Sequence, residues 1–273
     1  MQNGSTDLDI FYCGSRQYSD AVTGRIEPAG ARGKKRLTLT GSGYVRVPKT
    51  ALQNPWGKYT DDIIQVTIGE GLTELECGVF AGLRNLRSVY FPRTLTAIYS
   101  GAFSECGKLE TADLPDALQY IGPGAFQGCF SLEQVTFGSS LKNIQAGAFR
   151  GCKSLNKLIL PSTITEIKED AFADTGVEHL RLPDGLESVS TGCFSHCEKL
   201  EEVTVGEGLS VISDHAFNAC TTLKMLDFRS AKVLYHIHDL AFQNCNAIRA
   251  VYCREDQASL LRQHFRPEIL VIS

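Results

Sequence analysis

The sequence lacks several features that would place it in a class at once. No stretch approaches the roughly 20 apolar residues of a membrane-spanning helix, although 43% of the 273 residues are hydrophobic. The formal net charge of −4 leaves no basic excess to attract nucleic acid or an anionic membrane. The first nine residues are polar and contain no apolar signal segment. We therefore expect no membrane insertion and no nucleic-acid partner, in a protein that is either intracellular or has lost a signal segment.

Motifs of catalysis and metal binding are also missing. No G-x-S-x-G, P-loop or H-E-x-x-H run occurs. Cys193 and Cys197 stand four residues apart, whereas a thioredoxin-like C-x-x-C motif needs a spacing of three. His236 and His238 would share one face of a strand, but no third ligand accompanies them at motif spacing. We therefore expect a protein that is not an enzyme and that holds no cofactor and no metal.

Phenylalanine, in contrast, is abundant and marks an internal repeat. Leu, Ile or Val stands five and eight residues before each repeated phenylalanine, without a polar exception. A unit of about 23 residues cannot bury its own apolar face, so neighbouring units must stack into a solenoid in which each column forms a ladder. Eight of the 14 phenylalanines belong to this repeat: Phe80, Phe103, Phe126, Phe149, Phe172, Phe194, Phe217 and Phe242.

Each unit opens with a short strand pattern. Residues 86–91 and 200–205 have apolar side chains at their first, fourth and sixth positions, as expected of a strand that begins at a bend and then alternates. Pro or Gly follows in most units and ends the strand. Strands about 4.8 Å apart would give eight coils a parallel sheet on the order of 40 Å long. The units are not identical, since the fifth is one residue short after Phe172 and the eighth has two extra residues after Phe228.

The ten cysteines follow the same repeat. Three in a row cannot all form disulfides, and side chains in a parallel ladder point the same way. Leu83 and Thr175 occupy the same slot in two units, which favours a small buried apolar residue. Pairing of Cys13, Cys77, Cys193 or Cys253 stays open, including a Cys13–Cys77 disulfide. Six cysteines stand three residues after the phenylalanine: Cys106, Cys129, Cys152, Cys197, Cys220 and Cys245.

The unit L-x-x-[VL]-x-Φ-[PG]-x-x-[LI]-x-x-I-x-x-x-A-F-x-x-C-x-x-L resembles the BspA-type leucine-rich repeat, eight times between about residues 62 and 250. Residues 38–43, 54–56 and 63–66 resemble the N-terminal cap of bacterial proteins of this type. The resemblance implies a binding solenoid without family-wide catalytic residues. The family is found mostly in bacterial surface and secreted proteins, and several members are implicated in adhesion. It therefore implies location at the cell surface or secretion, with the cytoplasm as the alternative.

These observations predict a right-handed leucine-rich repeat solenoid. Its parallel β-sheet has about nine short strands joined by irregular or 3-10 outer turns. We expect residues 1–61 to form an N-terminal β-hairpin cap, residues 62–247 the eight repeats, and residues 248–273 a small α/β C-terminal cap. Caps are needed because the end coils would otherwise expose core and sheet edge. We expect the protein to be a monomer.

Each cap has its own pattern. In the N-terminal cap, residues 36–41 should pair with residues 21–26. The turn between them is basic, and a solvated turn is favoured over a nucleic-acid patch because no aromatic residues interleave with its charges. Its basic residues are Arg32, Lys34, Lys35 and Arg36. In the C-terminal cap, residues 248–253 predict a strand, residues 257–265 a helix and residues 269–272 a last strand.

The strand register predicts a binding surface. Strand positions two, three and five point away from the core and form the face that is concave in most leucine-rich solenoids. The middle of position two is acidic, which suits either a plain solvated face or a partner with a basic centre, held by apolar anchors at Tyr90, Ile159, Met225 and Tyr252. The candidate ligand-binding residues are Arg87, Tyr90, Glu110, Asp113, Glu133, Lys157, Glu178, His179, Arg181, Glu201, Glu202 and Tyr252.

The function that follows is binding without catalysis. We expect adhesion to, or recognition of, a host or cell-surface protein or glycan through the strand face. The alternative is an intracellular scaffold for protein interactions.

Overall fold

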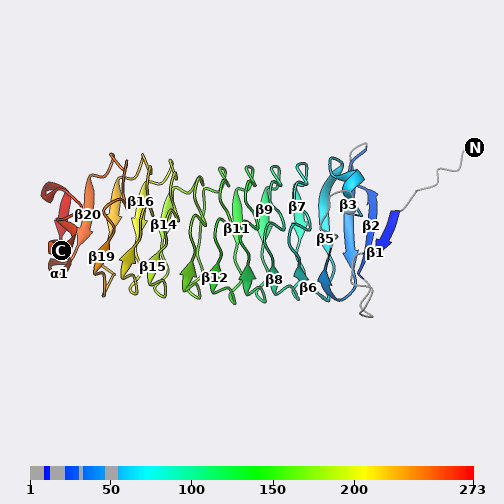
Figure 1. Ribbon diagram of the computed structural model, residues 1–273, viewed down its shortest axis with the longest axis horizontal. Coiled ribbons are helices and arrows are strands. Elements are labelled where there is room, and N and C mark those ends of the chain that lie inside the picture. Colours follow the sequence, from blue (N-terminus) through cyan, green and yellow to red (C-terminus); the bar gives the residue numbers. More distant parts are fainter. Residues whose placement is uncertain (1–8, 13–21, 31–32, 47–54) are drawn as a thin grey trace, which may run out of the picture.

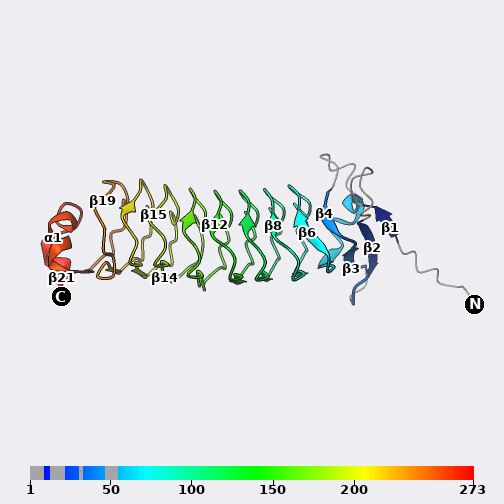
Figure 2. The same cartoon turned by 90° about the horizontal axis from the view of Figure 1, so that it is seen from below.

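The computed structural model describes residues 9–12, 22–30, 33–46 and 55–273, which form a long stack of coils (Figure 1). The stack runs nearly straight from the N-terminal strands to the C-terminal helix α1 (Glu255–Leu261), as a view turned by 90° also shows (Figure 2). Cys13 and Arg32 lie outside the described residues. We number the coils 1 to 8: residues 63–85, 86–108, 109–131, 132–154, 155–176, 177–199, 200–222 and 223–247.

The expected row of parallel strands is present along one side of the stack. Neighbouring strands pair residue for residue one coil apart, as Gln65 pairs with Ser88 and Glu202 with Met225. The row is divided between β7 and β9 and again between β11 and β14. At the first division the amide of Glu110 still donates to the carbonyl oxygen of Arg87 at 3.1 Å. Its strands are β5 (Ile63–Ile68), β7 (Ser88–Tyr90), β9 (Thr111–Asp113), β11 (Gln134–Thr136), β14 (His179–Arg181), β16 (Glu202–Thr204), β18 (Met225–Asp227), β20 (Ala250–Cys253) and β21 (Leu270–Ile272).

A second row of very short strands, which the sequence pattern did not predict, runs along another side. It contains the Ile column five residues before the phenylalanine, with Ile98 paired to Ile121. Two-residue strands show too little alternation to be read from sequence. They are β4 (Gly43–Val45), β6 (Leu72–Leu75), β8 (Ala97–Ile98), β10 (Tyr120–Ile121), β12 (Asn143–Ile144), β13 (Glu166–Ile167), β15 (Ser188–Val189), β17 (Val211–Ile212) and β19 (His236–Ile237).

The outer segments that carry the phenylalanines are chains of hydrogen-bonded turns. Within the described residues, 3-10 helix occurs only at η2 (Gly57–Tyr59) and η3 (Pro267–Ile269), so the outer turns take the irregular form of the two that the sequence predicted. These turns use the left-handed backbone region two residues before and two residues after the phenylalanine. Gly101 and Gly128 fill these positions in coils 2 and 3, whereas Ala219 is forced to a φ of 59° in coil 7. The two columns account for many of the 25 glycines.

The phenylalanines form a continuous column of stacked rings. Neighbouring ring centroids lie 5.1 to 5.5 Å apart from Phe80 to Phe242. Both caps extend the column, because Trp56 stacks on Phe80 at 5.6 Å and Phe265 meets Phe242 at 5.3 Å. The predicted phenylalanine core is therefore confirmed, and the caps continue it with rings of their own.

The cysteine column is buried, and each of its thiols donates a hydrogen bond to the preceding coil. Cys106 Sγ lies 3.3 Å from the carbonyl oxygen of Phe80, and the five other ladder cysteines repeat this contact with the Phe of the coil before. Burial raises the pKa of the Cys106 thiol to about 12. Cys77, Cys193 and Cys253 are also free thiols. The slot thus takes a small apolar side chain that can also donate a weak hydrogen bond.

The N-terminal cap extends both rows of strands. β2 (Thr23–Pro28) pairs antiparallel with β3 (Lys35–Thr40), as the sequence predicted, and β1 (Asp9–Tyr12) pairs with β2. β3 then pairs in parallel with β5, and β4 with β6. The cap therefore adds one coil-like layer that covers the edge of coil 1.

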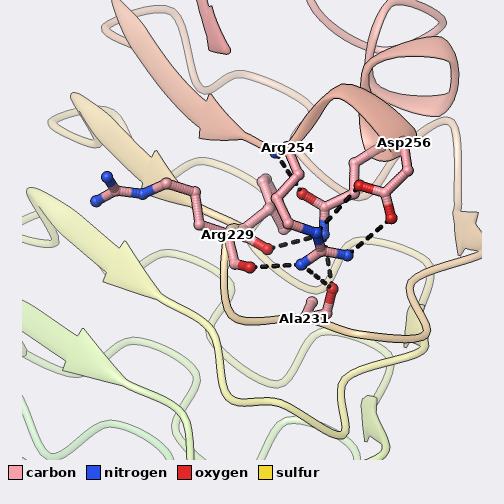
Figure 3. Close-up of polar contacts among 6 residues, drawn as sticks. Arg229, Ala231, Arg254 and Asp256 are labelled. Atoms are coloured by element: carbon pink, nitrogen blue, oxygen red, sulfur yellow. Dashed lines mark hydrogen bonds and ion pairs between the residues drawn. The ribbon is translucent and has the colours of Figure 1, made fainter. Parts of the chain in front are cut away.

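The C-terminal cap is held to the extra residues of coil 8 (Figure 3). The guanidinium of Arg254 donates to the carbonyl oxygens of Arg229 and Ala231 and pairs with Asp256. The Gln257 amide nitrogen donates to the carbonyl oxygen of Ala231 at 2.7 Å, and its oxygen accepts the amide of Arg254.

That second bond closes the first turn of α1 and starts the helix two residues before its predicted beginning. The helix also ends four residues before its predicted end, which frees Phe265 to join the ring column. The last strand β21 pairs in parallel with β20.

Candidate functional site: the strand face

The candidate binding residues all lie on the outer side of the first row of strands. Thr111 and Asp113 of β9 are exposed, whereas Ala112 between them is buried, and this alternation repeats along the row. Nine of the twelve predicted residues are exposed, and Glu201, Glu202 and Tyr252 are half-buried. Because the stack is nearly straight (Figure 2), the surface is a long strip rather than the concave hollow expected. We call it the strand face.

Ion pairs between coils neutralise part of the acidic column. Arg87 Nη1 lies 2.9 Å from Glu110 Oε1. Lys224 Nζ lies 2.6 Å from Glu201 Oε1, and this hydrogen bond lowers the pKa of Glu201 below its usual value. Glu133 and Glu178 have no ionic partner among the described residues. The unneutralised carboxylates of this column are therefore these two, on either side of coil 5.

The basic residues at the middle of the face differ in how far they are paired. His179 Nδ1 lies 3.4 Å from Glu202 Oε2, and Arg181 Nη2 lies 3.9 Å from Asp184 Oδ1. Lys157 makes no side-chain hydrogen bond or ion pair within the described part of the chain. Asp113 is not free, because it accepts a hydrogen bond from Thr136 Oγ1 at 2.9 Å. Coil 5 thus presents an unpaired cation between two unpaired carboxylates.

The four apolar anchors also differ in exposure. Ile159 is 81% exposed and Tyr90 53%. Met225 and Tyr252 are half-buried, and the Arg229 guanidinium lies 5.0 Å from the centre of the Tyr252 ring. Ile159 is therefore the anchor most open to a ligand.

A groove that the sequence pattern did not reveal opens beside Ile159. It has a volume of about 370 Å³ and lies between coils 4 and 5. Its walls are mainly apolar, with one amine, one hydroxyl and one amide at the rim. The lining residues are Gln134, Val135, Thr136, Phe137, Lys157, Ile159 and Pro161.

The groove coincides with a break in the strand ladder. In coil 3 the amide of Leu114 donates to the carbonyl oxygen of Thr136 in the next coil at 2.9 Å, and coils 6, 7 and 8 repeat this bond. The amides of Phe137 and Leu160 make no such bond within the described residues, and neither does the amide of Phe91 in coil 2. Coil 5 forms no strand there, and only Lys157 bridges to its two neighbours.

The same coil carries the one-residue deletion. The shortened turn brings the backbone of Gly176 against the preceding coil, where a Cβ atom would lie 2.3 Å from the carbonyl oxygen of Lys153. A side chain at this position would clash. The deletion was visible in the phenylalanine spacing, but its consequence at the strand face depends on how the coils stack.

The remaining chemistry gives no second site. His238 Nδ1 and His215 Nδ1 lie 3.1 and 2.7 Å from Asp214 Oδ1, while His236 is exposed. No group of three or more His, Cys, Asp or Glu in the described ranges is arranged to hold a metal. Among those residues, no helix combines the length and the apolar character needed to cross a membrane.

The stacked coils define a leucine-rich repeat protein. Residues 58–175 and 119–249 match the family model described as "BspA type Leucine rich repeat region (6 copies)". The chain belongs to this family, as its repeat unit predicted. No curated protein matches the chain.

Several solved structures are similar to this chain at low identity. A leucine-rich repeat protein from Bacteroides ovatus is 17% identical, with 95% of this chain and 100% of that chain covered and a TM-score of 0.36. A leucine-rich cell surface protein from Faecalibacterium prausnitzii is 18% identical, with 89% of each chain covered and a TM-score of 0.40. The pneumococcal vaccine antigen PcpA is 15% identical, with 98% and 99% covered and a TM-score of 0.41.

Proposed function

We propose that this protein is a non-catalytic binding solenoid that recognises a host or cell-surface protein or glycan through its strand face. The observation that carries the proposal is the centre of that face. There, exposed Ile159 and unpaired Lys157 line a groove, and the unpaired carboxylates of Glu133 and Glu178 lie in the coils on either side of coil 5. These side chains contribute nothing to the ring and thiol columns of the core. Solenoids commonly use such extended surfaces for binding.

Membership of the BspA-type family supports the binding class. Location at the cell surface, or secretion, belongs to the same proposal. We expect the binding unit to be a monomer, because one coil stack carries the whole face.

The test is a binding screen with two matched variants. The wild-type protein is screened against arrays of extracellular matrix proteins and glycans. Each hit is then measured with Glu133→Lys/Glu178→Lys, and with Glu169→Lys/Glu187→Lys as a control that makes the same charge change beside the second row of strands. Loss of binding in the first variant alone supports the strand face. Equal binding by both variants would place the site elsewhere.

A further inference from the structure

The groove between coils 4 and 5 has the features of a specific subsite. It lies where the repeat is irregular, since coil 5 lacks a strand in the first row, has Thr175 in the cysteine slot and is one residue short. Coils 3, 6, 7 and 8 present a closed ladder at the corresponding position, as the Leu182-to-Thr204 bond shows. The irregular coil therefore creates an apolar recess at one place along an otherwise regular strip.

Two complementary groups meet at this recess. Ile159, Pro161 and Phe137 supply apolar walls, and Ile159 leaves most of its surface in solvent. Lys157 lines the same groove and has no counter-ion in the described residues. A ligand that buries an apolar group here while bringing a carboxylate to Lys157 removes apolar surface from water and pairs the free cation.

The groove favours a peptide over a sugar. Phe137 is the one aromatic lining residue, and it is half-buried with its ring edge-to-face with Phe149 at 5.7 Å, so a sugar would find only part of one ring to stack on. The amides of Phe137 and Leu160 lack the ladder acceptor that their counterparts in coils 3, 6, 7 and 8 have. A peptide backbone supplies carbonyl oxygens for such donors.

We propose that this groove binds a peptide segment of the protein ligand in which a large aliphatic or aromatic residue stands next to an acidic one. The apolar side chain fills the recess against Ile159 and Phe137, and the carboxylate pairs with Lys157. The inference rests on the proposed function, because it names the chemistry of the partner at one point of the strand face.

The test uses defined peptides and the full chain. Three octapeptides in a Gly/Ser background carry Leu-Glu, Leu-Lys or Ser-Glu at their centre, and a neutral oligosaccharide is the fourth probe. Methyl shifts of Ile159 and Thr136 report binding at millimolar probe concentration. We expect the Leu-Glu peptide to shift these methyls and the Leu-Lys and Ser-Glu peptides to bind about tenfold more weakly, a difference of about 1.4 kcal/mol.

Variants separate the two contributions. Lys157→Gln should weaken the Leu-Glu peptide about tenfold and leave the Leu-Lys peptide unchanged, and Ile159→Ser should weaken both leucine peptides. Lys199→Gln, which removes an exposed charge away from the groove, is the control and should change neither. No shift with any peptide, equal binding of the Leu-Glu and Leu-Lys peptides, or methyl shifts with the sugar alone would each overturn the proposal.

The outcomes distinguish this inference from the proposed function. If the array screen finds a ligand that Glu133→Lys/Glu178→Lys abolishes while the peptides leave the groove methyls unshifted, the strand face binds its ligand without this subsite. If the Leu-Glu peptide binds the groove but every array ligand is insensitive to strand-face changes, the subsite stands and the adhesive function fails.

Discussion

The thiol of Cys129 lies 3.3 Å from the carbonyl oxygen of Phe103 and donates to it across the boundary between coils 2 and 3. That oxygen already accepts the amide of Cys106, so the sulfur adds a second bond that joins neighbouring coils. The thiol column therefore links the coils at the outer side, where the strand ladders do not reach.

Replacing Cys129 tests this link. Cys129→Ala removes both the sulfur and its hydrogen bond and should lower the free energy of unfolding by about 1 kcal/mol or somewhat more. Cys129→Ser keeps a donor of similar size and should cost less. Denaturant unfolding of the three proteins measures the difference. A serine variant no more stable than the alanine variant would show that the slot needs volume but not a donor.

Thiol labelling tests the burial of the same column. Burial raises the pKa of the Cys106 thiol from its ordinary 9.0 to about 12, whereas Cys77 is exposed. In a Cys13→Ser background, an aromatic disulfide reagent at pH 8 should label Cys77 quickly and the ladder thiols only on unfolding. Rapid native-state labelling of a ladder thiol, located by mass spectrometry, would contradict the closed column.

The same pKa shift predicts how stability changes with pH. The folded-state pKa of Cys106 is raised, so its contribution to stability is complete below about pH 9 and is lost as pH rises through 12. The free energy of unfolding, measured between pH 8 and 11, should fall as pH rises, and Cys106→Ala should reduce this fall. If the free energy of unfolding of Cys106→Ala falls as steeply with pH as that of the wild type, the fall comes from other groups.

The ring column makes a quantitative prediction for Phe149. It is fully buried, and its centroid lies 5.2 and 5.3 Å from those of its two neighbours in the column. Phe149→Ala should therefore lower the free energy of unfolding by about 3–5 kcal/mol. Phe130, which is 48% exposed, offers a matched control whose replacement by Ala should cost well under half as much. A loss within about 0.5 kcal/mol for Phe149→Ala would remove this column from the core.

Backbone strain gives a stabilising prediction. Ala219 has a φ of 59°, a left-handed conformation that glycine adopts at the same position of coils 3 and 4. Ala219→Gly should raise the free energy of unfolding by up to about 1 kcal/mol, because relief of the Cβ clash exceeds the added entropy of the unfolded chain. Ala146→Gly, at a turn position outside the left-handed region, should lower it by about 0.5–1 kcal/mol. If both changes destabilise equally, the φ of Ala219 carries no strain.

The sequence predicted most of the fold because its signal was repeated. The phenylalanine and isoleucine columns gave the number of coils and the core directly, and the alternation of residues such as Thr111, Ala112 and Asp113 gave the outward face. The second row of strands escaped detection because a two-residue strand is defined by its neighbours and not by its own pattern.

The candidate site was predicted only in outline. Register alone placed the twelve residues on one face, but it could not show that Glu110 and Glu201 are neutralised by residues one coil away. It also could not show that the short turn at Gly176 accompanies a groove on the strand side of coil 5. Both depend on how side chains and turns of different coils meet in space.

Trp56 and Phe265 end the ring column with aromatic contacts, Trp56 stacked on Phe80 and Phe265 tilted against Phe242. Within the ring column, each of these two cap rings therefore contacts only the phenylalanine of the adjacent coil, and this contact does not depend on how many coils lie between the caps. Gene duplication or loss of a whole unit can lengthen or shorten the coil stack by one coil at a time without requiring a new cap. The groove of coil 5 would then lie nearer to one end of the strand face or the other, with the same lining residues.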